Sequence, residues 1–264
     1  MKKQIVYEYS DELHDEFSGI IRDTITIDEN YQFVHTCPLW KIASFFIYRI
    51  VMTPVAYLYL KFKFHACIIG REKLKKSTDG CFLYGNHTNV PADGYIPTVL
   101  TFPKKDYVIV NADNVSLKGT RTFMEMIGAF PLPNTIGGMK PFMKAMKQYT
   151  KEKNNIVIYP EAHIWPYYIG IRPFTAESFA YPVMMEKPVY CFTTTYQHRA
   201  GRKANGRPRM TIYVDGPFLP DTCLKTKTAA QALRDKLYRT MCERSQNSDY
   251  EYVKYKKTVK NTEG

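Results

Sequence analysis

The longest apolar stretch of the chain, WKIASFFIYRIVMTPVAYLYLKF, runs from Trp40 to Phe62. A membrane-spanning helix needs about 20 apolar residues with few charges, but Arg49 lies near the middle of this stretch and Pro54 interrupts it. We therefore expect two half-helices, bent at the proline, in the plane of the membrane interface, with Lys41 and Lys61 against anionic lipid. The alternative is a pair of helices packed on the domain. Aromatic side chains expected at headgroup level are Trp40, Tyr48, Tyr57 and Tyr59.

Beyond Phe62, short apolar runs alternate with longer stretches of helical pattern. Short runs rich in β-branched and aromatic residues, bounded by polar or turn-forming residues, are typical of buried strands. Strands that alternate with helices indicate an α/β domain, with helices on both faces of a mixed, largely parallel sheet. The expected strands are 65–69, 81–84, 107–111, 156–159, 189–195 and 209–214.

Two of the intervening stretches predict amphipathic helices. In the first, between Met139 and Tyr149, apolar residues recur at helical spacing beside a stripe of lysines. The second is expected to begin at a capping box formed by Thr228 and Gln231 and to continue through Met241. The inward-facing positions are Met139, Phe142, Met146 and Tyr149 in the first helix and Leu233, Leu237 and Met241 in the second.

The pattern divides the chain into three parts. Residues 1–61 form an acidic segment followed by the apolar helices, residues 62–246 form the α/β domain, and residues 247–264 form a charged C-terminal tail. At 264 residues, the chain has room for one large domain with a substantial core.

The net charge of +12 requires a partner of opposite charge or an exposed basic tail. Nucleic acid, an anionic membrane and phosphorylated small molecules are the partners that an excess of Lys and Arg favours. The sequence has no zinc-finger spacing, RNA-recognition signature or clear helix-turn-helix, so we expect no nucleic-acid partner. The basic segment 198–209 offers an alternative site for lipid headgroups or nucleic acid, but a solvated loop between two strands is the simpler interpretation.

The cysteines and the N-terminus indicate the cellular compartment of the protein. Its six cysteines are scattered, without a C-x-x-C pair, and several lie inside apolar runs, as reduced cysteines do. The first residues lack the apolar core of a signal peptide. We therefore expect a cytoplasmic protein, peripheral on the inner face of the membrane.

The segment CFLYGNHTNVPAD, from Cys81 to Asp93, carries the first candidate chemistry. Its apolar run ends at Gly85, which is typical of a buried strand that feeds a loop, and the loop contains His87. A histidine that acts as general base needs one accessible ring nitrogen and an acceptor for the other. Asp93 provides that acceptor if the turn brings it back to the imidazole.

A second predicted strand is followed by another titratable residue. The run 156–159 ends in Pro160 and Glu161. The carboxyl ends of strands are where α/β proteins place their active sites. We therefore expect His87 and Glu161 to open onto one pocket from adjacent strand ends.

These residues resemble the glycerolipid (lysophospholipid) acyltransferases, the family of the 1-acylglycerol-3-phosphate acyltransferases. The family's first motif is Asn-His, four further residues and Asp; this chain has Asn86, His87 and Asp93, with one residue more between His and Asp. The third motif, Phe-Pro-Glu-Gly-Thr-Arg, is similar to the segment that keeps Pro160 and Glu161. The resemblance extends over about residues 62–218, with the second motif at Gly128–Pro133, the fourth at Lys187–Tyr190 and the Pro-Phe segment at Arg172–Met184.

The resemblance implies a reaction and its partners. In this family the histidine deprotonates an acceptor hydroxyl, which attacks the thioester of acyl-coenzyme A or acyl carrier protein. It implies His87 as the base, Asp93 as its orienting partner and Glu161 as a contact of the acceptor, without a metal or cofactor. The acceptor would be a lysophospholipid or a glycerol-phosphate-like molecule, met at an anionic membrane surface.

Two departures from the family pattern concern the acceptor. Pro133 stands where the family has a phosphate-binding arginine. Ala162–Ile164 stands where the family has a second such arginine. A phosphate in a partly buried site favours arginine over lysine. Arg172, after the third motif, and Arg121, before the second, are therefore the predicted substitutes.

Two rival functions are weighed against acyl transfer. Gly-Asn-His also occurs in metallophosphoesterases, but their other metal-binding motifs, D-x-H, G-D-x-x-D and G-H-x-H, are absent from the sequence. The altered motifs also fit a catalytically inactive, membrane-associated lipid-binding relative. The joint presence of His87, Asp93 and Glu161 favours an active enzyme.

Overall fold

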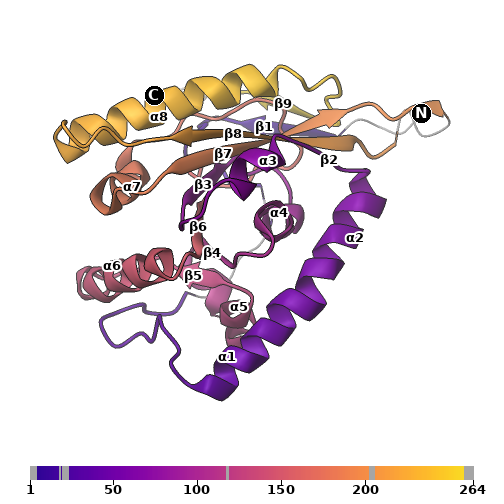
Figure 1. Ribbon diagram of the computed structural model, residues 1–264. Helices are drawn as coiled ribbons and strands as arrows, with labels where there is room; N and C mark the ends of the chain where they lie inside the picture. The colour runs from indigo at the N-terminus through magenta and orange to yellow at the C-terminus, as the bar shows by residue number, and fades with distance from the viewer. Residues whose placement is uncertain (1–4, 18, 20–23, 117–118, 202–205, 259–264) are drawn as a thin grey trace, which may run out of the picture.

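A seven-stranded sheet forms the centre of the protein in the computed structural model, which describes residues 5–17, 19, 24–116, 119–201 and 206–258. The strand order is β2-β8-β7-β3-β6-β4-β5 (Figure 1), and every neighbouring pair is parallel except β7 and β8. The predicted mixed, largely parallel sheet is confirmed. Its strands are β2 (Cys67–Ile69), β3 (Phe82–Gly85), β4 (Asp106–Val110), β5 (Ala129–Pro131), β6 (Asn155–Ile158), β7 (Val189–Gln197) and β8 (Arg209–Phe218).

Helices cover both faces of the sheet. On one face, α6 (Ile136–Lys151), α7 (Ala180–Met185) and α8 (Thr226–Ser245) enclose a core that includes Phe82 and Tyr84 of β3. On the other face, Leu83 lies in a second core with residues of α2, α3 and α4, as the side-chain alternation of a strand requires. The remaining bounds are α3 (Arg71–Lys75), α4 (Ala92–Thr101), α5 (Arg121–Met126) and the 3₁₀ helices η2 (Ala112–Val115) and η3 (Glu177–Phe179).

The two predicted amphipathic helices are present. The predicted apolar positions of α6 and α8 are buried or partly buried, and the lysines of α6 are exposed. The predicted capping box of α8 is wrong, because the helix begins two residues before Thr228, with Lys225 at the N-cap. The Gln231 side chain instead donates to Asp235, one turn further along the helix.

A small second sheet joins the two ends of the described chain. In it, β1 (Ile5–Tyr9) pairs in parallel with β9 (Val253–Lys257), and Glu8 lies opposite Lys256. The sequence analysis predicted neither strand, and it assigned β9 to a charged tail. Residues 259–264 of that predicted tail, and residues 202–205 of the basic segment, lie outside the described residues. The boundaries of the three predicted parts remain predictions.

The apolar stretch forms one continuous helical segment from Pro38 to Phe64, long and apolar enough to cross a membrane. It consists of α1 (Pro38–Phe45), a π-helical portion η1 (Phe46–Met52) and α2 (Thr53–Phe64), and it runs along one side of the molecule (Figure 1). The predicted division into two half-helices at Pro54 is therefore wrong. The wider π-helical turns directly precede the proline, and Thr53 N–H bonds to the Tyr48 carbonyl, five residues back.

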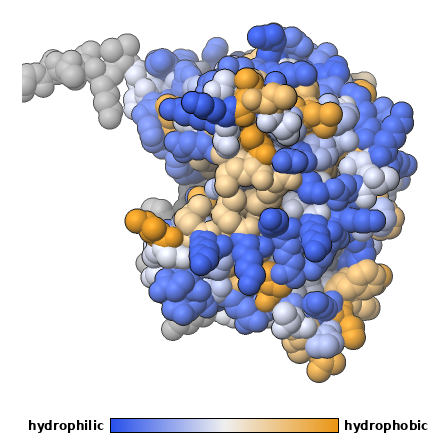
Figure 2. Space-filling model, turned by 60° about the vertical axis from the view of Figure 1, so that its left-hand side comes forward, coloured by the Kyte–Doolittle hydropathy of each residue, from blue (hydrophilic) through white to orange (hydrophobic). Residues whose placement is uncertain are grey.

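This segment presents a polar stripe to the domain and an apolar face outward. The Tyr48 hydroxyl donates to the Asp106 carboxylate over 3.1 Å and is buried, so the expected position of Tyr48 at headgroup level is wrong. The Thr53 and Thr98 hydroxyls lie 2.9 Å apart. Figure 2 shows hydrophobic surface at the lower end of the molecule, where α1 lies in Figure 1. Leu39, in α1, is 78% exposed. Other exposed apolar side chains of the segment are Ile42, Phe45, Phe46, Ile50, Val55, Leu58 and Phe62.

Arg49, the charge within the apolar segment, bonds to the loop that follows α4. Its guanidinium donates to the carbonyl of Pro103 over 2.9 Å and to that of Lys104, and it lies 4.6 Å from the centre of the Tyr48 ring. A hydrogen bond with a charged donor contributes about 1.5–3 kcal/mol when it is buried and less where, as at Pro103, it is exposed to water. Arg49 therefore fastens the middle of the helix to the domain instead of facing lipid.

We predict that Arg49→Met lowers the free energy of unfolding by about 1–3 kcal/mol, because two carbonyls in the loop after α4 lose a charged donor. Urea unfolding in mild detergent measures the change. Lys41→Met, at an exposed position of α1, is the matched control and is expected to have little effect. Equal stability of the two variants would contradict the anchoring role of Arg49.

Candidate active site

The site begins where β3 ends, at a glycine in close contact with its neighbours. A Cβ atom at Gly85 would lie 2.3 Å from the Phe192 ring and 2.8 Å from the Tyr159 ring. Only glycine therefore fits between these rings. Directly beyond it, the Tyr159 ring stacks on the His87 imidazole, with ring centres 4.7 Å apart.

The loop after β3 folds back so that His87 meets Asp93 in the first turn of α4. The distance between His87 Nδ1 and Asp93 Oδ2 is 2.8 Å, although the spacing is one residue longer than in the family motif. The backbone N–H groups of Thr88 and Asn89 also donate to Asp93 Oδ2, each over 2.8 Å. An oxygen that already accepts two N–H groups is an acceptor for the imidazole too, so the proton belongs on Nδ1 and Nε2 is left as an acceptor. Asp93 is 2% exposed and the His87 side chain 24%.

Glu161 joins the end of β6 to the end of β3. One carboxylate oxygen accepts the backbone N–H of His87 over 3.0 Å, and the other accepts the backbone N–H of Arg172 over 3.0 Å. Its side chain is 1% exposed. Burial raises the pKa of the Glu161 carboxyl, while the Arg172 guanidinium and the two N–H groups act in the opposite direction.

Arg172 lies beneath the surface, against Glu161. Its guanidinium is 3.5 Å from the Glu161 carboxylate, and its side chain is also 1% exposed. It donates to the carbonyls of Glu12 and Glu161, each over 3.3 Å, and to that of His163. The Trp165 ring lies 5.0 Å from the guanidinium.

The two ends of the described chain cover this buried pair. The Trp165 indole donates to the Asp15 carbonyl over 2.8 Å, and Phe17 N–H donates to the Ile164 carbonyl over 3.3 Å. Tyr255 of β9 stacks on Trp165 with ring centres 4.8 Å apart. The sequence analysis missed these contacts. The signal that could have found them is the alternation of aromatic and charged residues in β1 and β9.

The structure brings together four of the five predicted site residues. His87, Asp93, Glu161 and Arg172 form one continuous set of contacts. Arg121 lies apart from them, on α5, where it is 3.0 Å from Glu125 and stacks over Tyr31. The catalytic and substrate-binding roles of all five remain predictions.

Comparison with known proteins supports the interpretation of this geometry. The sequence matches the family described as Acyltransferase over residues 65–195, from just before β2 almost to the end of β7. Among solved structures, the chain is similar to the crystal structure of the 1-acyl-sn-glycerophosphate (LPA) acyltransferase PlsC from Thermotoga maritima. The TM-score is 0.50 at 13% identity, over 80% of this chain and 97% of that chain, so the likeness concerns the fold.

No curated protein matches the sequence. The matched stretch nevertheless contains His87, Asp93 and Glu161, and with them the first and third motifs. Residues 65–195 are therefore those of an acyltransferase domain, and its motifs and fold are similar to those of the glycerolipid acyltransferases.

Proposed function

We propose that this protein transfers a fatty acyl group from a thioester donor to a hydroxyl group of a lysophospholipid or glycerol-phosphate-like acceptor. The observation that carries the proposal is the His87–Asp93 pair, 2.8 Å apart, at a strand end of an acyltransferase domain. The substrate named for the Thermotoga maritima enzyme, 1-acyl-sn-glycerophosphate, supports a lysophospholipid as the acceptor. The donor would be acyl-coenzyme A or acyl carrier protein.

The proposed reaction needs one base and accurate positioning. His87 Nε2 takes the proton of the acceptor hydroxyl while the hydroxyl oxygen attacks the thioester carbonyl carbon. The carbon–sulfur bond then breaks, and the imidazolium returns its proton to the departing thiolate. Asp93 keeps the Nδ1 proton in place and stabilises the imidazolium that forms between the two steps.

Glu161 and Arg172 are assigned positioning roles in this proposal. The Glu161 carboxylate fixes the backbone of His87, and the Arg172 guanidinium, 3.5 Å away, opposes the rise in the pKa of Glu161 that burial causes. Both side chains are engaged with the protein and buried, so neither offers free surface to an acceptor phosphate. This assignment replaces the acceptor contacts expected from the sequence.

The apolar segment supports association with a membrane. Its outward face from Leu39 to Phe62 is apolar, while its inner face is bonded to the domain through Tyr48, Arg49 and Thr53. A helix with one flank fixed to the protein along its length suits the membrane interface. We propose that the protein lies on the inner face of the cytoplasmic membrane.

We predict that His87→Ala reduces kcat by about 10²–10⁴-fold, because the general base is lost. Asp93→Asn is expected to cost as much or less, since it only releases the orientation of the imidazole. The measurement is thiol release from acyl-coenzyme A with a mixture of lysolipids, corrected for the exposed cysteines Cys37, Cys67 and Cys223.

His14→Ala is the matched control, because His14 also lies 2.8 Å from an aspartate but in an exposed pair. It is expected to keep full activity. Full activity of both His87→Ala and Asp93→Asn would rule out the proposed base. No turnover by the wild-type protein with any donor and acceptor would favour the inactive relative.

We predict that Arg172→Ala lowers the free energy of unfolding by about 3–5 kcal/mol, because it leaves the buried Glu161 carboxylate without its partner. In the fraction that stays folded, kcat is expected to fall while the KM for the acceptor changes little. Arg121→Ala is the control: Arg121 is itself exposed, and Glu125 keeps Tyr31 and His35 as partners, so the loss is expected to be at most about 1 kcal/mol. If Arg172→Ala is as stable as wild type and raises only the KM of phosphorylated acceptors, Arg172 contacts the phosphate instead.

We predict that replacing Leu39, Phe45 and Phe46 with serine releases the protein from phospholipid vesicles, because these side chains are exposed on the apolar segment. Co-sedimentation measures the bound fraction. Ile136→Ser with Leu219→Ser, two exposed apolar positions elsewhere, is the control and is expected to bind as wild type does. Unchanged binding of the triple variant would remove the membrane assignment.

A further inference from the structure

A cavity of about 410 Å³ lies at the end of the sheet opposite His87. Cys81 and Asn155, which line it, stand at the beginnings of β3 and β6, whereas His87 and Glu161 follow the ends of the same strands. Its other walls come from α3, the end of α4 and the loop at 102–104. This cavity is therefore separate from the candidate active site.

Basic side chains and apolar side chains line the cavity together. Arg71, Lys75 and Lys104 supply three positive charges, while Leu74, Leu100 and Phe102 supply apolar surface. The Arg71 Nε–H donates to the Leu100 carbonyl over 3.1 Å, which orients the guanidinium without a carboxylate. The Lys104 ammonium donates to the carbonyls of Ser77 and Asp79.

The carboxylates near these cations are engaged elsewhere. Asp79 is ion-paired with Lys187. Asp106 is buried and accepts hydrogen bonds from Tyr48, Thr101 and Asn155. Among the described residues, none that lines the cavity carries a carboxylate, so its positive charge is open to an anion.

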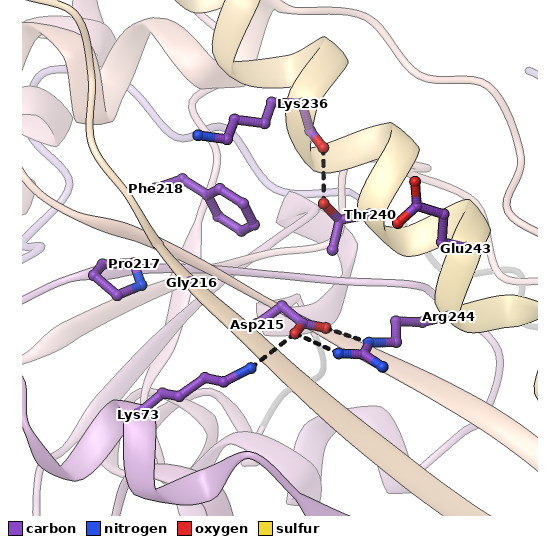
Figure 3. Close-up of a pocket in the computed structure, with 9 residues that line it drawn as sticks. All are labelled: Lys73, Asp215, Gly216, Pro217, Phe218, Lys236, Thr240, Glu243 and Arg244. Carbon is purple, nitrogen blue, oxygen red and sulfur yellow. Dashed lines mark hydrogen bonds and ion pairs between the residues drawn. The ribbon is translucent and has the colours of Figure 1, made fainter.

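A second cavity, of about 500 Å³, shows the contrasting case. Figure 3 shows Asp215 between Lys73 and Arg244, with bonds of 2.7–2.8 Å to both. Glu243 lines the same cavity and adds another negative charge. Two of its three cations are thus already paired, and it carries little net attraction for an anion.

The first cavity adjoins the apolar segment. Phe102 and Pro103 of its wall belong to the loop that binds Arg49: the guanidinium lies 5.4 Å from the Phe102 ring and donates to the Pro103 carbonyl. Phe102 is 50% exposed, and Ile50, beside Arg49, is 53% exposed. A membrane that covers the apolar segment therefore lies next to the cavity.

We propose that this cavity binds the phosphate-bearing headgroup of an anionic membrane phospholipid that is not the acyl acceptor. The three cations bind the phosphate, and the apolar wall at Phe102 faces the beginning of the acyl chains. Arg71 is the residue suited to bind two phosphate oxygens at once, because its terminal N–H groups form a planar fork. The proposal rests on membrane association through the apolar segment but not on acyl transfer.

The test compares wild type with the double variant Arg71→Gln, Lys75→Gln in co-sedimentation with two kinds of vesicle. One kind is phosphatidylcholine alone, and the other includes phosphatidylglycerol. The double variant is expected to bind the neutral vesicles as wild type does and the anionic vesicles at least about tenfold more weakly. Lys144→Gln with Lys147→Gln, exposed on α6 at the other face of the sheet, is the charge-matched control with an expected loss below about twofold.

A second measurement distinguishes binding at one specific site from general attraction to a charged surface. It also distinguishes a phospholipid ligand from free phosphate. Short-chain phosphatidylglycerol, kept below the concentration at which it forms micelles, is expected to bind wild type at one site that the double variant lacks. Inorganic phosphate at equal concentration is expected not to displace it. Displacement by phosphate would overturn the lipid assignment, and equal binding by wild type and double variant would overturn the site.

Two checks keep these results interpretable. Lys75→Gln alone, at an exposed position, repeats the test if the double variant unfolds at a lower temperature than wild type. Acyl transfer to a soluble acceptor is expected to be equal in wild type and double variant. Binding is measured without an acyl donor, so failure of the proposed acyl transfer leaves the binding result readable.

Discussion

The buried Glu161 carboxylate is the group through which the parts of the site are connected. It accepts one N–H from the loop after β3 and another from Arg172, so it joins the ends of two neighbouring strands to the loop that follows the third motif. A charge in this position is costly unless it is paired and hydrogen-bonded. Arg172 provides the pairing, and the carbonyls of Glu161, His163 and Glu12 fix Arg172 in turn. The position of His87 therefore depends on residues far from it in the sequence.

Close packing around the end of β3 also positions the pair of His87 and Asp93. Gly85 permits the rings of Tyr159 and Phe192 to close on the strand end, and Tyr159 then supports the imidazole from one side. Asp93 is held by the backbone of the loop that it closes, through Thr88 and Asn89. The loop between His87 and Asp93, although one residue longer than in the family motif, therefore still brings the two side chains within 2.8 Å. The backbone N–H groups of the loop hydrogen-bond to the Asp93 carboxylate and hold it there.

The strands and amphipathic helices are predictable because their patterns are local. Runs such as Phe82–Gly85 are buried on both faces, and the apolar stripe of α6 repeats at helical spacing. The pairing of His87 with Asp93 is predictable for the same reason, since only five residues lie between them. A local pattern does not show which distant segments of the chain pack over a given residue.

Arg172 illustrates that limit. Its type and position fit a phosphate ligand, but the segment around Glu12 and Asp15 and the ring of Trp165 enclose it. The straight course of the apolar segment is likewise a matter of context, because Arg49 finds carbonyl acceptors on the domain. The sequence shows Arg49 and Pro54. It does not show the carbonyl partners of Arg49 or the π-helical turns that accommodate Pro54.

The pairing of β1 with β9 has a consequence for the order of folding. Ile5 lies beside Val253, almost the whole described chain apart, so these strands meet only after the intervening chain has closed the longest loop of the fold. A two-stranded sheet is marginally stable by itself. It is therefore the part expected to form last and to open first in local fluctuations, well below the free energy of global unfolding. An opening that separates Tyr255 from Trp165 is expected to loosen the cover of the Arg172–Glu161 pair, so the rigidity of the backbone beneath His87 is coupled to this small sheet.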